Sequence, residues 1–163
     1  IDFTMTGIYV APDDSAQPSV TYAAQASPLI FKKGNTTGLN VMGLTTAKLS
    51  NYSLEIGNEI VYRELVGGTG EVLLTNRNVT GNLTIEAVAL ATKDYFATAL
   101  ADTLGIIEFT HGTTAGNIVK VDSARADIAD VSYGDLDGIA MLEIPFTAVP
   151  STTGNDEVEL VYT

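Results

Sequence analysis

The sequence contains no cysteine and no tryptophan, and it has a single histidine among its 163 residues. Without cysteine, the chain cannot form disulfides, an iron–sulfur cluster, a thiolate nucleophile or a cysteine-rich zinc site. Basic side chains are also few, with 8 lysines and arginines against 20 aspartates and glutamates and a net charge of −12. Since affinity for a polyanion comes mainly from lysine and arginine, this balance argues against a nucleic-acid-binding protein and against an anionic membrane as partner.

Long hydrophobic runs are missing as well. No stretch reaches the ~20 apolar residues that span a bilayer, and no basic segment precedes an apolar one as in a signal peptide. The first residue is Ile1 rather than methionine, so we expect a trimmed, processed or excised segment. Hydrophobic residues make up 45% of the chain and charged residues 17%, which favours a folded domain over disorder. At this length we expect one domain, spanning residues 1–163.

The strongest pattern is an alternation of apolar and polar residues, which places successive side chains on opposite faces of a strand. It is clearest over residues 139–146, where Leu142 and Ile144 share a face that Glu143 does not. Similar runs occur in four more segments, residues 50–56, 83–89, 106–110 and 157–162. Segments rich in Gly, Asn and Asp separate the runs, as turns between strands do. The chain is therefore predicted to be mainly β, an antiparallel β-sandwich or barrel.

One segment departs from this alternation and is predicted to form a flanking α-helix over about residues 92–104. Thr92 has the side chain of an N-cap, and Gly105 is placed to end the helix. Four apolar residues recur at helical spacing and form a face that we expect to pack on the sheet: Phe96, Ala99, Leu100 and Leu104.

Residues 60–77 are predicted to form a long β-arm or loop with a glycine tip at residues 67–70. A long loop in a compact domain either has a function or is disordered. Apolar residues flank the tip on both sides, so we expect this segment to rest against another surface. Residues 11–18 carry two prolines and two aspartates and are predicted to be a connector.

None of the residue patterns that accompany catalysis or metal binding is complete. His111 has no G-x-S-x-G nucleophile motif with it, so we interpret it as a turn or capping residue. Residues 67–70 lack the spacing of a phosphate-binding loop, and residues 130–138 lack the glycine and glutamate positions of an EF-hand. We therefore predict no catalytic residue, no cofactor and no metal site, and a protein that is not an enzyme.

The acidic side chains are the most informative polar group. Residues 121–163 contain nine acids and one base, Arg125. Five glutamates fall on the polar face of predicted strands: Glu55, Glu86, Glu108, Glu143 and Glu159. A surface of this charge keeps a protein dispersed and repels polyanions.

The order of several strand and turn strings between residues 49 and 162 resembles the phage tail tube proteins, the major tail proteins of long-tailed phages. The strings that carry the resemblance are Leu54-Glu55-Ile56-Gly57-Asn58-Glu59, Thr84-Ile85-Glu86-Ala87, Ala91-Thr92-Lys93-Asp94-Tyr95, Phe109 to Asn117 (FTHGTTAGN), Tyr133 to Gly138 (YGDLDG) and Gly154-Asn155-Asp156-Glu157. They are strand and turn segments, and the likeness covers about two-thirds of the chain.

The resemblance implies a small β-sandwich or barrel with one flanking helix, six copies of which form a ring. Rings stack into the hollow tube of a virion tail, made in the host bacterial cytoplasm, and the partners are further copies of the chain and other tail proteins. DNA passes through without specific binding, and no membrane takes part. Some relatives have two such barrels in tandem, so the chain is either a single tail-tube-like domain or one half of a longer protein.

In that setting the five glutamates are candidates for lining the channel, because carboxylates repel the phosphates of passing DNA. Residues 60–77 are the candidate arm between subunits, and its arginines are placed to meet acids on a neighbour. The arm residues that we single out are Arg63, Leu65, Gly68, Gly70 and Arg77. Two alternatives remain open at this point: a β-sandwich module that binds glycans or acts as an adhesin, and a hydrolase that uses a pair of acids.

Overall fold

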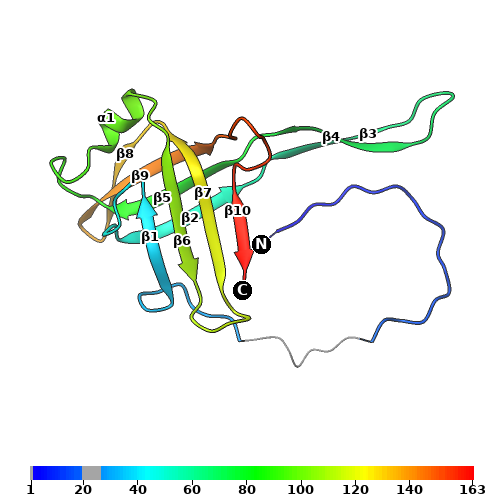
Figure 1. The fold of residues 1–163 in the computed structure, drawn as a ribbon, viewed down its shortest axis with the longest axis horizontal. Helices are drawn as coiled ribbons and strands as arrows, with labels where there is room; N and C mark the ends of the chain where they lie inside the picture. Colours follow the sequence, from blue (N-terminus) through cyan, green and yellow to red (C-terminus); the bar gives the residue numbers. More distant parts are fainter. Residues whose placement is uncertain (1, 20–26) are drawn as a thin grey trace.

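The computed structural model describes residues 2–19 and 27–163, and the regular structure in them is almost entirely β (Figure 1). The strands are β1 (Thr36–Val41), β2 (Leu49–Glu55), β3 (Asn58–Arg63), β4 (Glu71–Arg77), β5 (Thr80–Glu86), β6 (Gly105–His111), β7 (Val119–Ile128), β8 (Ser132–Leu136), β9 (Ile139–Ala148) and β10 (Glu159–Tyr162), and the helix is α1 (Tyr95–Leu100). Strands β2, β5, β6, β9 and β10 coincide with the five runs of alternating residues. The prediction of a mainly β, antiparallel fold is confirmed.

One eight-stranded sheet folds over on itself into two layers. Its order is β1-β6-β7-β9-β5-β2, with β10 paired to β7 and β8 paired to β9. We call β1, β6, β7 and β10 the β6–β7 layer, and β2, β5, β9 and β8 the β5–β9 layer. A short stretch of pairing, from Ala126 opposite Ala148 to Ile128 opposite Phe146, joins the two layers. In the described part of the chain β1 and β2 do not pair, so the sandwich is not closed into a barrel.

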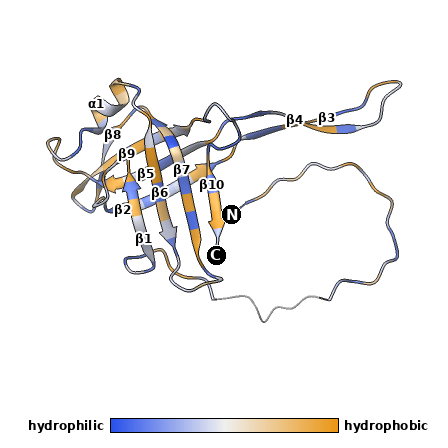
Figure 2. Ribbon diagram, in the orientation of Figure 1, coloured by the Kyte–Doolittle hydropathy of each residue, from blue (hydrophilic) through white to orange (hydrophobic). Residues whose placement is uncertain are grey.

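The inner faces of the two layers meet in one hydrophobic core. Leu83 and Ile85 of β5 are fully buried, and they lie opposite Ile144 and Leu142 of β9. Residues directly opposite each other on antiparallel strands share a face, so these four side chains form one apolar surface that packs against Ile107 of β6. The alternation of hydrophobic and hydrophilic residues along the strands is visible in Figure 2.

Aromatic rings close the gap between the layers beside β2. The ring of Tyr52 lies edge-on to Phe109 of β6, with 4.9 Å between centroids, and stacks on Phe146 of β9 at 6.1 Å. Burial removes the phenol from water and raises the pKa of Tyr52 well above its usual value. The Tyr52 hydroxyl has no hydrogen-bond partner among the described residues.

The predicted helix is present but shorter than residues 92–104. It begins at Tyr95 because the side chain of Asp94 caps it, accepting a hydrogen bond from the Ala97 amide at 2.9 Å. Thr92 lies two residues before Asp94, in a separate turn where its amide donates to the Ala89 carbonyl at 2.8 Å. The prediction of Thr92 as the cap is therefore wrong, because a second capping side chain stands closer to the apolar segment.

The end of the helix also differs from the prediction. The amide of Thr103 donates to the Thr98 carbonyl at 3.2 Å, and Asp102 has a φ of 48°, which is the geometry of a Schellman turn. This turn stops α1 before Leu104. Of the predicted packing face, Phe96 and Ala99 do contact the core.

Leu100, by contrast, is 89% exposed, and Tyr95 takes its place as the buried anchor of the helix. The Tyr95 hydroxyl donates to the Val41 carbonyl at 3.2 Å, and burial raises the pKa of Tyr95 to about 12. This bond ties α1 to the end of β1.

Strands β3 and β4 form a separate two-stranded hairpin that projects from the sandwich (Figure 1). Of the two predicted forms for residues 60–77, a long β-arm or a loop, the structure shows the β-arm, with strand bounds Asn58–Arg63 and Glu71–Arg77. β3 follows β2 and β4 precedes β5, so the hairpin extends the β5–β9 layer outward.

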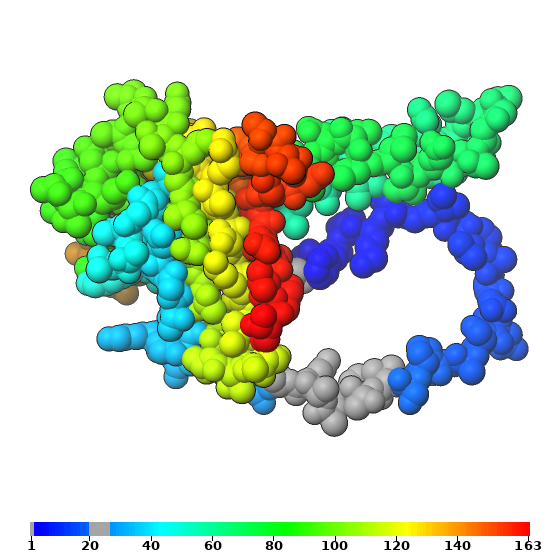
Figure 3. Space-filling model, viewed as in Figure 1, coloured from blue at the N-terminus to red at the C-terminus, as the bar shows by residue number. Residues whose placement is uncertain are grey.

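Residues 2–19 contain no helix or strand and run in an arc outside the two layers, with the first residues next to β10 in this view (Figure 3). They include the predicted connector at residues 11–18, which is exposed along its whole length. No helix in the described ranges is long and apolar enough to cross a membrane.

Candidate assembly surfaces: a projecting arm and two acidic faces

The arm, residues 58–77, carries apolar side chains on both of its faces. Tyr62 lies opposite Val72 on one face, and Val61 lies opposite Leu73 on the other. Neither face is covered by the sandwich, and Leu74 for example is 57% exposed. A two-stranded hairpin alone is marginally stable in water, so burial of these side chains against a partner would stabilise the arm.

The tip of the arm exposes two further apolar residues. Leu65 is largely exposed and Val66 fully so. The Gly68 amide donates to the Leu65 carbonyl at 3.0 Å, and Gly67 has a φ of 89°, in the left-handed region that favours glycine. The predicted glycine tip is thus a tight turn that presents Leu65 and Val66 at the far end of the arm.

Two more of the predicted arm residues hold the hairpin strands together. The Arg63 guanidinium lies 3.0 Å from the carboxylate of Glu71, which is directly opposite on β4. Gly70 lies against the ring of Tyr62, where a Cβ would come within 2.6 Å of the hydroxyl oxygen. Both members of the Arg63–Glu71 pair are about half exposed, so the pair contributes little to stability and stays accessible to a partner.

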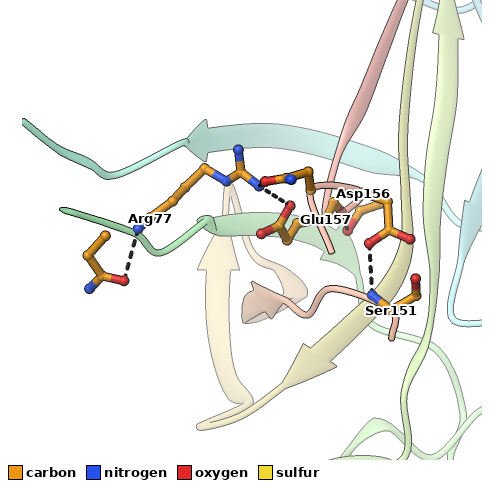
Figure 4. A network of polar contacts seen from close by, with 7 residues as sticks. Arg77, Ser151, Asp156 and Glu157 are labelled. Atoms are coloured by element: carbon orange, nitrogen blue, oxygen red, sulfur yellow. Dashed lines mark hydrogen bonds and ion pairs between the residues drawn. The ribbon is translucent and has the colours of Figure 1, made fainter. Parts of the chain in front are cut away.

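The root of the arm is fixed to the sandwich by Arg77, the last residue of β4 (Figure 4). Its guanidinium lies 2.6 Å from the Glu157 carboxylate and also donates to the side-chain oxygen of Asn155 at 3.0 Å. The Glu157 side chain is only 12% exposed, so the pair is partly desolvated. Hydrogen bonding from Arg77 lowers the pKa of Glu157. Arg77, like Arg63, therefore pairs within its own chain.

The loop that receives Arg77 is itself held in place by Asp156. The Asp156 carboxylate accepts a hydrogen bond from the Ser151 amide at 2.8 Å, and bonding from Ser151 lowers the pKa of Asp156 (Figure 4). The backbone carbonyl of Glu157 accepts from the buried hydroxyl of Ser123 on β7 at 3.2 Å. The root of the arm is thereby connected to the β6–β7 layer as well as to β5.

Of the five candidate glutamates, two lie on the outer face of the β6–β7 layer. Glu108 of β6 and Glu159 of β10 both lie opposite Asp122 of β7, so three carboxylates form one row across the layer. The ammonium of Lys120 stands in this row, 2.8 Å from Asp122 and 3.0 Å from Glu108. The hydrogen bond to Asp122, and to a lesser extent the one to Glu108, raises the pKa of Lys120 and so favours its charged form.

The other three candidates, Glu55, Glu86 and Glu143, lie on the outer face of the β5–β9 layer. Glu143 lies opposite Thr84 of β5, and Glu86 follows two residues later on the same face of that strand. Glu86 pairs with Lys48 at 2.7 Å, while Glu55 at the end of β2 is exposed. Because the inner faces of the layers pack together, the two groups of glutamates point away from each other.

Sequence reasoning missed Asp122 and Lys120 as members of the acidic row. A signal for them exists in the segment Val119 to Asp122, where valine alternates with the two charged residues. The structure places Val121 among the buried residues and the two charged side chains outside.

The residues that suggested possible chemistry have structural roles. The Nδ1 atom of His111 lies 3.0 Å from the Thr36 hydroxyl, and its Nε2 atom lies 3.2 Å from the Leu29 carbonyl, so the ring links β6 to the chain before β1. Asp137 and Gly138 have φ values of 53° and 83° and form the tight turn between β8 and β9. Within the described ranges no group of three or more His, Asp or Glu residues could hold a metal ion.

The family model of the phage tail tube protein matches residues 1–159. The chain belongs to the phage tail tube protein family. The resemblance seen in the strand and turn strings is thereby confirmed. The match to the family model also includes residues 1–48, which contain none of those strings. A tail tube protein is a structural component of a virion tail, so the comparison does not favour the glycan-binding or adhesin alternative. No curated protein matches the chain.

Several solved structures are similar to this tail tube protein. The cap that terminates the tube of the anti-feeding prophage is 13% identical, with a TM-score of 0.57 over 88% of this chain and 100% of that one. A chain in the tail of an empty gene transfer agent particle, refined with C6 symmetry, is 20% identical, with a TM-score of 0.44 over 74% and 85% of the two chains. A chain in the native gene transfer agent virion is 16% identical, with a TM-score of 0.48 over 81% and 99%. The likeness to the prophage cap supports the fold.

Proposed function

We propose that this tail tube protein forms hexameric rings that stack into a tube, with an acidic channel through which DNA passes without specific binding. It acts without catalytic activity and away from membranes. The observation that carries the proposal is the arm, which is fixed at its root by Arg77 and leaves the apolar residues Val66 and Leu74 exposed. A contiguous exposed apolar surface of this kind marks an interaction site.

The β5–β9 layer has the edges that a ring requires. β2 pairs only with β5 and β8 pairs only with β9, so this layer ends in an unpaired strand on each side in the described part of the chain. The β6–β7 layer has open edges as well, at β1 and β10, but the arm continues from β2 and β5, so we place the ring contact on the β5–β9 layer. An open edge is a template for pairing with another chain. Pairing of β8 in one copy with β2 in the next is a head-to-tail contact, which closes into a ring when the rotation allows.

In such a ring the outer face of the β5–β9 layer would line the channel. This face carries Glu55, Glu86 and Glu143, while Glu108 and Glu159 would lie on the outside of the tube. Among the residues that the structure describes, Lys48 is the only lysine paired with these three glutamates, so the lining keeps a net negative charge. Carboxylates at the wall repel phosphates and let DNA slide.

The arm would then connect rings. It continues from β2 and β5, and Leu65 and Val66 at its tip would bury against the sandwich of a copy in the adjacent ring. Covering one such side chain fully is worth roughly 1.5–3 kcal/mol, and a ring would repeat the contact in every subunit.

The test is the mass of the protein in solution, followed by electron microscopy of concentrated samples. A ring of six would have a mass of about 103 kDa, six times the 17.1 kDa of the chain. Val66→Asp at the tip should leave rings but prevent tubes, whereas the control Thr69→Asp at the same tip should form both. Monomers at all concentrations for the wild-type chain would contradict the proposal, as would normal tubes from Val66→Asp.

A further inference from the structure

The N-terminal segment, residues 2–10, has strand-forming residues but no strand partner. In an extended chain Phe3, Met5 and Tyr9 fall on one face, and Thr4, Thr6, Ile8 and Val10 fall on the other, so the apolar–polar alternation is confined to residues 3–6. The three apolar side chains are 78%, 88% and 83% exposed, and no backbone hydrogen bond joins this segment to the other described residues. Thr, Tyr, Ile, Val and Phe are also the residues that strands favour.

The edge of the sheet at β10 lacks a neighbouring strand, as the N-terminal segment lacks a strand partner. In the described part of the chain β10 pairs only with β7, so its second edge is open. Leu160 lies opposite Val121 on the inner face of the layer, and Tyr162 lies opposite Val119. Exposure rises from 8% at Val121 to 39% at Leu160 and 63% at Tyr162. The apolar inner face therefore continues past the area that the opposite layer covers.

A cavity of about 570 Å³ extends this uncovered face toward β2. Its lining includes Val119 and Val121 of β7 and Tyr52 of β2, whose hydroxyl has no hydrogen-bond partner within residues 2–19 and 27–163. Phe31, which precedes β1, already enters from the N-terminal side and lies edge-on to Phe109 at 5.7 Å. The chain before β1 is thus in contact with the same opening.

We propose that residues 2–10 of one copy add as a strand to the open edge of β10 in a second copy, with Phe3 and Met5 covering Leu160 and Tyr162. The segment supplies the backbone groups that the edge lacks and the apolar side chains that the inner face lacks. Within one chain both surfaces stay exposed. This proposal rests on the proposed function in one respect, that the partner is a second copy of the chain. The surface involved, the edge of β10, is different from the arm.

The tether is long enough for this exchange. Residues 11–26 lie between the segment and Ser27, whose carbonyl accepts a hydrogen bond from the Asn117 side chain at 3.4 Å. A chain of that length reaches at most roughly 50 Å when extended, which exceeds the ~30 Å diameter of a small domain.

Cysteine cross-linking tests the proposal, because the natural chain has no cysteine. Thr4→Cys in one copy and Val161→Cys in another place single thiols on the same outer face of the added strand and of β10. After mixing, assembly and oxidation, we expect a disulfide-linked dimer of twice the 17.1 kDa chain mass on a non-reducing gel. Two controls replace one cysteine at a time. Ser15→Cys in the tether replaces Thr4→Cys, and Ser53→Cys on the β2 edge replaces Val161→Cys.

Three outcomes of cross-linking would overturn the proposal. The first is no dimer from Thr4→Cys and Val161→Cys in wild-type-like assemblies. The second is an equal yield with Ser15→Cys or Ser53→Cys. The third is a disulfide within one chain when both cysteines are placed in the same dilute molecule, which would show pairing in cis. If the wild-type chain does not assemble at all, the proposed function fails; if it assembles without this cross-link, only the present inference fails.

A second measurement uses the two faces of the segment. Met5→Asp should weaken association of the full chain by about tenfold or more, because an apolar side chain of this size contributes at least ~1.4 kcal/mol when buried. Thr6→Asp, on the opposite face, should change association by less than about threefold. Equal effects of the two variants, read from the concentration dependence of the mass, would contradict strand addition.

Discussion

The ion pair at the root of the arm leads to the most direct prediction. The Arg77 and Glu157 side chains are 26% and 12% exposed, and the charged atoms are 2.6 Å apart. Glu157→Gln keeps an acceptor for the guanidinium but removes the negative charge. The variant leaves the partly desolvated charge of Arg77 without its counter-charge, which costs roughly 3–5 kcal/mol in a fully buried pair, so at this partly exposed site we expect the free energy of unfolding to fall by about 2 kcal/mol.

The assay is thermal and chemical denaturation of the dilute, unassembled chain. For a chain of this length 1 kcal/mol shifts Tm by roughly 2–4 °C, so Glu157→Gln should lower Tm by about 4–8 °C. The matched control is Glu71→Gln, which breaks the Arg63–Glu71 pair at 3.0 Å on the arm, where both groups are about half exposed. Its expected cost is under about 1 kcal/mol. Equal costs for the two variants would refute the view that burial at the root makes its pair the stronger one.

The same pair has a signature in pH. Arg77 lowers the pKa of Glu157 below its ordinary value of 4.5, so near that pH the unfolded chain binds more protons than the folded one. The contribution of the pair is therefore fully present above about pH 5 and is lost as the pH falls through the folded pKa of Glu157. Glu157→Gln should flatten this part of the stability profile. An unchanged slope would show that other carboxylates account for the acid sensitivity.

The remaining predictions concern the neck of the arm, the helix and the channel. Gly57 has a φ of 60° and its missing Cβ would overlap the Asn78 carbonyl, so Gly57→Ala should cost more than the roughly 1–2 kcal/mol of left-handed strain alone; Gly116→Ala, with a φ of 84° and open space, is the control in the same denaturation experiment. Tyr95→Phe removes the bond to the Val41 carbonyl and should lower the free energy of unfolding by about 0.5–1.5 kcal/mol in urea. If the β5–β9 layer lines the channel, Glu143→Lys should make assembled tubes retain DNA inside while Glu159→Lys should not, as measured by nuclease protection; the reverse result would place the β6–β7 layer inside.

The alternating runs were sufficient to predict the strands that bury one face. Leu83 and Ile85, or Leu142 and Ile144, are apolar residues separated by polar ones, and burial of one face is the physical cause of that pattern. β1 was not predicted, since its residues Thr36–Val41 form a mostly polar strand whose pairing with β6 is decided by distant residues. The helix bounds were wrong because two capping side chains, Thr92 and Asp94, compete, and only the fold selects between them.

For the candidate site, the sequence predicts the face of a strand on which each glutamate lies but not the layer to which that strand belongs. Alternation correctly places Glu108 and Glu143 on outer faces, because each lies between buried neighbours on its strand. Their assignment to different layers depends on which strands pair across long sequence separations, and no local pattern encodes that. The partner of Arg77 was likewise hidden, since Glu157 lies 80 residues away in sequence.

The narrow neck of the arm has a mechanical consequence. The hairpin leaves the sandwich between the β2–β5 pair and the β3–β4 pair. At this point the two chain segments are joined by one backbone hydrogen bond, from the Asn78 amide to the Gly57 carbonyl at 3.3 Å. Load applied at the tip is carried through two peptide strands and the ion pair beside them. In an assembly linked by such arms, bending would concentrate at these joints, and each sandwich would keep its shape while the filament curves.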